Sequence, residues 1–148
     1  RGDCGSIMIR LGIFKQAPVR IPREQIEKLF NKIIAKEAAS NAAGKINLIF
    51  VDDRSIRKLN KEFRKKDKST DVLSFNIETP KHANATIGEI YISVGTARRQ
   101  AREYNSRVNE VLLRLFCHGL LHLLGYDHIK SADRTKMEAC ERFYLESN

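Results

Sequence analysis

Three of the four histidines lie in one eleven-residue segment, HGLLHLLGYDH, which begins at His118. His118 and His122 are four residues apart, and helical residues at this spacing share one face about 6 Å apart, so both imidazoles can reach a single ion. Gly125 lets the helix end in a left-handed conformation, which brings His128 back toward the same point. Three neutral imidazoles with an open fourth position are typical of a catalytic zinc site. We therefore predict His118, His122 and His128 as ligands of one metal ion.

The residues around these histidines support a metal site. A lone histidine among leucines is usually a core residue, but three at this spacing favour a metal. Leucines recur there at helical spacing and predict a buried helix, which a rigid metal site needs. They are Leu112, Leu115, Leu120, Leu121 and Leu124. Cys117 adjoins His118, yet consecutive helical residues point about 100° apart, so we expect Cys117 to pack rather than bind the ion. Zinc is the predicted metal, and sites of three histidines also accept nickel, cobalt or manganese.

The histidine spacing also matches that of the metzincin proteases, in which Glu follows the first ligand and acts as general base. Gly119 occupies that position here and has no side chain to accept a proton. Met137 follows His128 closely enough to suggest the methionine turn of those proteases, but its helical context favours core packing. The sequence keeps the ligand spacing and lacks the base, which disfavours a metalloprotease.

The net charge of +9 is concentrated in two segments. Residues 54–68 contain eight basic residues against two acidic ones, and residues 98–107 contain four arginines against one glutamate. Segregated positive charge suits a polyanion such as nucleic acid, and a solvated helix face is the alternative. The residues that we predict to contact the nucleic acid are Arg57, Lys61, Arg64, Lys65, Lys66 and Lys68.

A metal beside clustered positive charge indicates phosphodiester chemistry. A bound metal ion lowers the pKa of water toward about 7 and stabilises charge on phosphate oxygens. An arginine makes bidentate contacts to the same oxygens. We select Arg64 because it follows Phe63, which we predict to be a core residue that holds Arg64 near the sheet; a plain surface charge is the alternative. Arg64 and His118 are our candidate catalytic residues.

The length of 148 residues is enough for one domain with a substantial core. The hydrophobic fraction of 42% is ordinary for a globular protein, and no apolar run approaches the roughly 20 residues of a membrane span. No signal peptide is visible, and we expect the polar residues 1–6 to be disordered. Three widely spaced cysteines, an odd number, favour reduced thiols and a cytoplasmic location.

Hydrophobic periodicity predicts elements in the order β-α-β-α-β-β-α-α-α. The expected strands are Ile7–Phe14, Ile46–Val51, Asp71–Ile77 and Glu89–Val94. The expected helices are Pro22–Ala39, one that starts at Asp52 or Asp53 with Ile56, Leu59 and Phe63 on its inner face, Thr96–Tyr104, Asn109–Leu124 and Ala132–Leu145. The first two β-α-β crossovers favour parallel pairing, and the short connection between the last two strands favours an antiparallel pair. We predict a single-domain α+β fold with a mixed, mostly parallel four-stranded sheet, about five helices and a metal site on a buried helix.

The histidine segment, His118–His128, resembles the signature of the YbeY family of bacterial endoribonucleases, also called rRNA maturation factors. A second block is similar to the family's segment before and along its third strand; it comprises Leu59-Asn60, Phe63-Arg64 and Lys68–Phe75. A third block, Gly88–Ile92, is similar as well, with Glu89 where many members have Asp. The resemblance covers about residues 45–145.

This resemblance implies metal-dependent cleavage of single-stranded RNA, used in 16S rRNA 3′-end maturation and ribosome quality control. It implies zinc on His118, His122 and His128, an important arginine at Arg64, and a mixed four-stranded sheet with about five helices. The expected partners are ribosomal RNA and the small ribosomal subunit or its proteins, with no DNA and no membrane. On this basis residues 1–148 form one metal-dependent endoribonuclease domain.

Three hypotheses follow from the residues and the resemblance together. The leading one is a zinc-dependent endoribonuclease in which Arg64 binds the scissile phosphate. Whether water attacks the phosphorus or activates the 2′-OH stays open. The second is a non-catalytic, zinc-containing ribosome-assembly factor that binds RNA through its basic face. The third is a metalloprotease with an unusual base, which the missing Glu disfavours.

Overall fold

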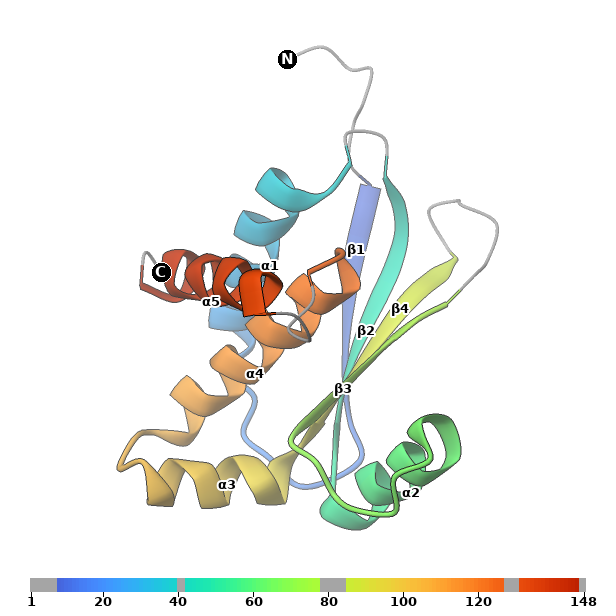
Figure 1. The fold of residues 1–148 in the computed structure, drawn as a ribbon, viewed down its shortest axis with the longest axis vertical. Coiled ribbons are helices and arrows are strands. Elements are labelled where there is room, and N and C mark those ends of the chain that lie inside the picture. The colour runs from blue at the N-terminus through green and yellow to red at the C-terminus, as the bar shows by residue number, and fades with distance from the viewer. Residues whose placement is uncertain (1–7, 40–41, 78–84, 127–130, 147–148) are drawn as a thin grey trace.

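Four strands and five helices make up the part of the chain that the computed structural model describes, residues 8–39, 42–77, 85–126 and 131–146 (Figure 1). The strands are β1 (Met8–Lys15), β2 (Ala43–Val51), β3 (Val72–Asn76) and β4 (Thr86–Ser93). The helices are α1 (Arg23–Glu37), α2 (Asp53–Arg64), α3 (Val94–Glu103), α4 (Val108–Leu123) and α5 (Ser131–Glu146). The predicted order of elements and the α+β class are confirmed. The predictions for residues 1–6 and for His128 lie outside the described residues.

The strands form one mixed sheet in the order β1-β2-β4-β3. β1 and β4 each pair in parallel with β2, and β3 pairs antiparallel with β4. The prediction that the second β-α-β crossover gives a parallel pair is therefore wrong. The short connection makes β3 the antiparallel neighbour of β4, and β4 can lie beside β2 only if β3 lies outside it. β3 is consequently an edge strand, with one side not covered by another strand of the sheet.

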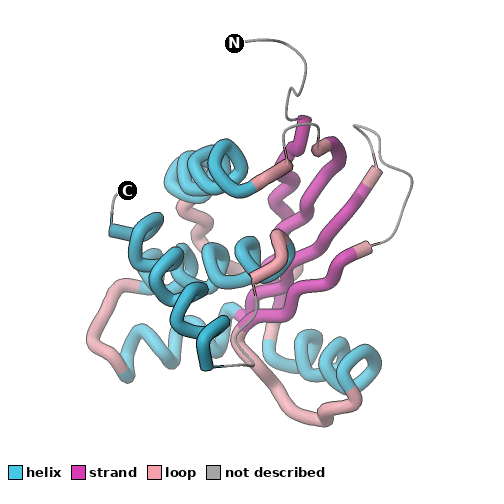
Figure 2. Tube along the Cα trace, turned by 45° about the horizontal axis from the view of Figure 1, so that its top comes forward, coloured by secondary structure: helices cyan, strands magenta, loops and turns pink. Residues whose placement is uncertain are grey.

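Helices cover the two faces of the sheet unequally (Figures 1 and 2). Alternate residues of β2 point to opposite faces, as expected for a buried central strand. Leu48 and Phe50 join the large core under α1, α4 and α5, whereas Ile49 and Val51 pack in a smaller cluster with Ile56 of α2. The metal site predicted on α4 would therefore lie on the helix-rich face.

α4 is the most enclosed of the described helices, because it packs against β3, β4, α1, α3 and α5. Its fully or almost fully buried residues are Val111, Leu112, Leu115, Phe116, Cys117, Leu120 and Leu121. The prediction of a buried helix is confirmed. Met137 of α5 is also 1% exposed, so core packing accounts for it.

Asp53 joins α2 to the end of β4. Its carboxylate accepts hydrogen bonds from the hydroxyl of Ser93 and from the Thr96 hydroxyl at 2.9 Å, and it forms an ion pair with Arg99 at 2.9 Å. The hydrogen bond from Arg99, followed by those from the two hydroxyls, lowers the pKa of Asp53 to about 2. This cluster fixes the start of α2 against the start of α3, so the position of α2 relative to the sheet is set at its first residue.

Phe63, in the last turn of α2, is 58% exposed, so the prediction that it is a core residue is wrong. Ile56, on the same apolar stripe, is fully buried over the sheet. The ring of Phe63 instead meets Phe75 on the edge strand β3, where no further strand of the described sheet extends to cover it.

No helix within the described ranges is both long enough and apolar enough to cross a membrane.

Candidate active site

Two of the predicted metal ligands, His118 and His122, lie on one face of α4 and open into the same cavity. Their Nδ1 atoms are engaged by separate partners. Nδ1 of His118 lies 2.6 Å from a carboxylate oxygen of Glu141 in α5, and Nδ1 of His122 lies 2.8 Å from the carbonyl oxygen of Tyr126. Metal-binding histidines usually have such a partner on the second ring nitrogen, which fixes the ring and its tautomer. The donor set therefore fits a metal bound through the two Nε2 atoms.

The segment after α4 begins the turn that the sequence predicts. Gly125 has a φ of +111°, a conformation that side chains rarely adopt. The hydroxyl of Tyr126 then donates a 2.9 Å hydrogen bond to Glu37 at the end of α1. This hydrogen bond fixes the position of Tyr126, two residues before His128, against α1. His128 itself lies outside the described residues, and its role as third ligand stays a prediction. Among the described residues, no group of three or more His, Cys, Asp or Glu side chains could hold a metal ion.

Cys117 is completely buried and packs in the core, as predicted. Burial, together with the nearby Glu141 carboxylate, raises the pKa of its thiol to about 12. The thiol stays protonated at neutral pH, whereas a thiol that binds a metal does so as a thiolate.

One cavity of about 470 Å³ brings the histidines and part of the basic segment together. It runs along β3 between α4 and the end of α2. The chemically active side chains in its lining are Arg64, Lys66, Lys68, Ser74, His118 and His122. Arg57, Lys61 and Lys65 are exposed but are not part of this lining. Arg57 instead pairs with Asp67 at 2.9 Å.

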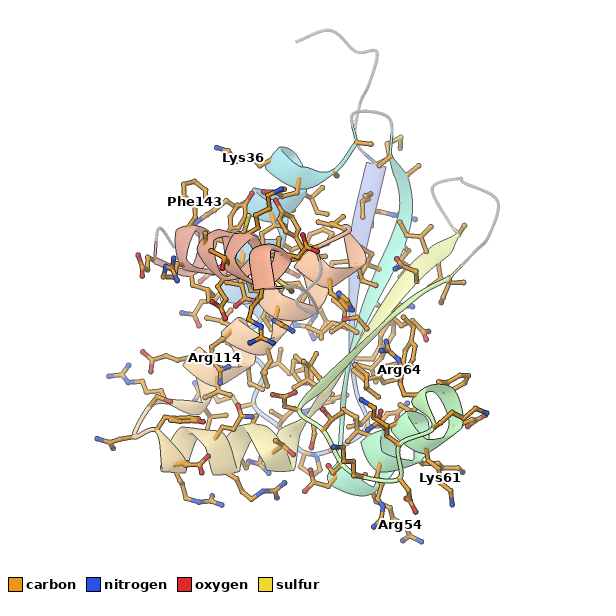
Figure 3. All side chains as sticks on the ribbon, in the orientation of Figure 1. Lys36, Arg54, Lys61, Arg64, Arg114 and Phe143 are labelled. Carbon is orange, nitrogen blue, oxygen red and sulfur yellow. The ribbon has the colours of Figure 1, made fainter. Side chains whose placement is uncertain are left out.

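Arg64 is held at the cavity by β3 rather than by a buried Phe63. Its guanidinium donates a 2.7 Å hydrogen bond to the carbonyl oxygen of Ser74 and lies 5.2 Å from the centre of the Phe75 ring. The carbonyl can accept this bond because β3 is an edge strand. A guanidinium has five N–H donors, so further donors can serve a phosphate. Figure 3 places Arg64 on the sheet side of α2, with Arg54 and Lys61 on its outer side.

The loop after α2 is shaped by a buried amide. Asn60 is 3% exposed, and its side-chain nitrogen donates a 2.9 Å hydrogen bond to the carbonyl oxygen of Lys68. Lys65 ends the helix in the left-handed conformation, with a φ of 59°. These two features fold the segment back along β3, which brings Lys66 and Lys68 to the cavity.

Gly119 is packed directly against the sheet. A Cβ atom at this position would lie 2.8 Å from Cγ2 of Ile90 and 2.9 Å from Oγ of Ser74. The Ser74 hydroxyl also donates a 3.0 Å hydrogen bond to the carbonyl oxygen of Gly119. At the position where proteases carry their base, any side chain would therefore displace its neighbours, and the glycine allows α4 to lie close to β3.

Gly119→Ala is expected to lower the free energy of unfolding by up to about 2 kcal/mol, because overpacking a filled site costs about 1–3 kcal/mol and helix propensity returns about 1 kcal/mol. Alanine is intrinsically about 1 kcal/mol better than glycine inside a helix, so the sign of the change separates packing from helix propensity. Urea denaturation followed by circular dichroism measures it. A variant that is more stable than wild type would contradict the close approach of α4 and β3.

The fold and the site together define a class: an α+β protein in which oriented histidines on a central helix open into a basic cavity. Within this class, the chain belongs to the YbeY family, since the family model described as Endoribonuclease YbeY matches residues 13–148. The resemblance of the three sequence blocks is thereby confirmed.

Individual relatives agree with this assignment. A protein named Endoribonuclease YbeY from Anaeromyxobacter dehalogenans is 46% identical over an alignment of 111 residues that covers 72% of this chain and 58% of that protein. One of the same name from Desulforamulus reducens is 42% identical over 132 residues, covering 83% of this chain and 86% of that protein. The chain spans only 35% to 58% of three of the curated relatives that it matches.

The fold is also similar to the solution structure of the protein TM1509 from Thermotoga maritima. The two are 29% identical with a TM-score of 0.62, over 92% of this chain and 87% of that one.

Proposed function

We propose that this chain is a metal-dependent endoribonuclease that cleaves single-stranded RNA. The observation that carries the proposal is the single cavity in which His118 and His122 face Arg64, Lys66 and Lys68. A site for a cation beside three basic side chains suits a phosphodiester better than a peptide. Membership of the YbeY family, whose curated relatives are named endoribonucleases, supports the same conclusion.

The residues have separate tasks in this proposal. His118, His122 and His128 hold the ion, which when bound lowers the pKa of water toward about 7 and stabilises charge on phosphate oxygens. Glu141 and the Tyr126 carbonyl fix the orientation and the tautomer of the His118 and His122 rings. Three imidazole ligands suit zinc, with nickel or another divalent ion as a substitute.

Arg64 orients the scissile phosphate with the N–H groups that do not bind Ser74. Lys66 and Lys68 add positive potential along the cavity, while Arg57, Lys61 and Lys65 attract RNA more distantly from outside it. The nature of the product termini would tell whether water attacks the phosphorus or the 2′-OH does.

The proposed biological role is 16S rRNA 3′-end maturation and ribosome quality control, with ribosomal RNA and the small subunit or its proteins as partners. A cytoplasmic location belongs to this proposal and is supported by the free thiols of Cys117 and Cys140. We expect no action on DNA or at a membrane. The peptidase alternative is weakened by Gly119, where any side chain would displace its neighbours.

The test compares three substrates of one sequence: single-stranded RNA, the same RNA annealed to its complement, and single-stranded DNA. We expect the zinc-loaded protein to cleave only the first. Removing the metal with a chelator, verified by elemental analysis, should stop cleavage, and added zinc should restore it. Cleavage by verified metal-free protein would refute metal dependence. RNA binding without cleavage by metal-loaded protein would favour the non-catalytic assembly factor.

A further inference from the structure

An aromatic ring lies exposed immediately beside the cavity. Phe63 directly precedes Arg64 in α2, and 58% of its surface is accessible. Single exposed apolar residues are common on protein surfaces, so exposure alone assigns no role. The surroundings of Phe63 are what distinguish it.

The ring of Phe63 packs against the ring of Phe75 on β3. Its ring centre lies 5.4 Å from that of Phe75, with 61° between the ring planes. Phe75 in turn contacts Tyr91, at 6.0 Å between centres, and the Arg64 guanidinium, at 5.2 Å. These contacts restrict the ring of Phe63 while most of its surface stays accessible. A partner that stacks on it would therefore meet a ring that is already ordered.

The surface around Phe63 is strongly positive. Within residues 61–66 four side chains are basic and only Glu62 is acidic, and all of them are exposed. Exposed aromatic rings among basic side chains are the usual means of binding single-stranded nucleic acids, because every base has a face that can stack. A duplex keeps its bases stacked inside, so such a ring selects unpaired RNA.

We propose that Phe63 is a base-stacking subsite for single-stranded RNA, next to the phosphate that Arg64 binds. Phe63 and Arg64 are consecutive in the chain and both contact Phe75. The exposed Phe63 ring and the Arg64 guanidinium are thereby held next to each other, and Arg64 lines the cavity. This inference rests on the proposed function and adds a physical basis for single-strand preference.

The experiment measures Kd of the metal-loaded protein for a short single-stranded RNA whose phosphodiesters are replaced by cleavage-resistant phosphorothioates with 2′-O-methyl riboses, and for versions with an abasic nucleotide at each position in turn. Gel analysis after each titration verifies that the RNA is intact. Wild type should lose about tenfold in affinity when one particular base is missing, as is typical of one stacked base. Phe63→Ala should bind the complete RNA about tenfold more weakly and show no further loss at that position. Phe63→Tyr should behave as wild type.

Phe143 provides a matched control on another part of the surface. It is 53% exposed and has the Lys36 ammonium 5.0 Å from its ring centre, but it lies on α5, away from Arg64 (Figure 3). Phe143→Ala should retain wild-type affinity. Circular dichroism and urea denaturation check that each variant is folded.

The stacking subsite is overturned if Phe63→Ala binds as wild type does, if it keeps the same abasic penalty, or if Phe143→Ala loses as much. If wild type cleaves single-stranded RNA while any of these holds, only the subsite fails. If the wild type neither binds nor cleaves RNA, the proposed function fails and the subsite fails with it.

Discussion

Replacing His118 with alanine is expected to remove the bound metal and to slow RNA cleavage by about a thousandfold, with the fold retained. A metal ion supplies several kcal/mol of charge stabilisation to the transition state, which corresponds to a rate factor of that order. The side chain of His118 is 33% exposed and faces the cavity, so its truncation removes a ligand rather than core packing. His122→Ala should have the same effect, because both histidines are proposed ligands of the same ion and line the same cavity.

Metal content after gel filtration and the cleavage rate of single-stranded RNA are the two measurements. Metal-free wild type is the reference, and both histidine variants should match it. A variant that loses metal but cleaves normally would remove His118 from the catalytic site. Parallel loss of folding stability and RNA affinity in His122→Ala, with no cleavage by wild type, would favour the non-catalytic factor.

Glu141→Ala tests the role of the residue that orients His118, separately from the role of His118 as the proposed metal ligand. The Glu141 side chain is 18% exposed and contacts Nδ1 of His118, the ring nitrogen opposite the one proposed to bind the metal. Loss of such a partner weakens metal affinity by about 10- to 100-fold. Cleavage should recover at saturating metal in Glu141→Ala and should not recover in His118→Ala. Glu141→Gln, which can still accept a hydrogen bond, should lie between Glu141→Ala and wild type.

The sequence was sufficient to place His118 and His122 on one face of a helix, because their relative position depends only on their spacing in that helix. Two residues four apart on one helix share a face whatever the fold around them. Glu141 escaped prediction because it comes from α5, and only the packing of α5 on α4 brings it to His118. A signal was present nonetheless. Met137 and Tyr144 are buried on α5, and Glu141 lies between them at helical spacing, where a carboxylate needs a partner.

For Phe63, helical periodicity predicted burial, but the side chain is exposed. Its spacing from Ile56 places both on one face of α2, and periodicity assumes that the whole face is covered. The strand order decides otherwise, because β3 is the edge of the sheet and α2 ends there. The same edge explains how Arg64 reaches the cavity although Phe63 is not buried. The anchors of Arg64, the Ser74 carbonyl and the Phe75 ring, belong to a strand whose position follows from the full topology.

At Gly119 the sequence shows only that a general base is missing, and the structure adds a physical reason. The sequence established that no general base follows the first histidine. The structure supplies a steric cause, since α4 packs on β3 and β4 at that glycine and a Cβ atom there would lie within 3.0 Å of Ile90 and Ser74. The close packing that disfavours a glutamate at this position is thus the same packing that holds the histidines beside β3.

Arg64→Ala is expected to reduce kcat/KM for single-stranded RNA by about 10²- to 10³-fold, the range found when one donor to developing charge is removed. Metal content should be unchanged, since Arg64 belongs to α2 and contacts β3 rather than the histidines. Stability should change little because the residue is exposed. Cleavage rates measure kcat/KM, elemental analysis measures the metal content, and urea denaturation measures the stability.

Arg64→Lys tells whether the geometry of the guanidinium or its positive charge is responsible for the effect of Arg64 on kcat/KM. Lysine keeps the positive charge but loses the planar fork that can bind Ser74 and a phosphate simultaneously, and it loses the guanidinium over Phe75. We therefore expect Arg64→Lys to remain closer to Arg64→Ala than to wild type. Full activity in Arg64→Lys would reduce the role of Arg64 to general positive potential.

Arg54→Ala is the matched control for charge, because Arg54 is an exposed arginine on the outer side of the same helix (Figure 3). It should leave kcat/KM within about twofold of wild type at physiological salt, where charges beyond about 8 Å are largely screened. The loss in Arg64→Ala should persist at higher salt, since a directional hydrogen bond to phosphate is screened less than a distant charge. If raising the salt concentration removes the difference between the two variants, Arg64 attracts RNA without positioning the phosphate, and the assignment of Arg64 to the catalytic site is wrong.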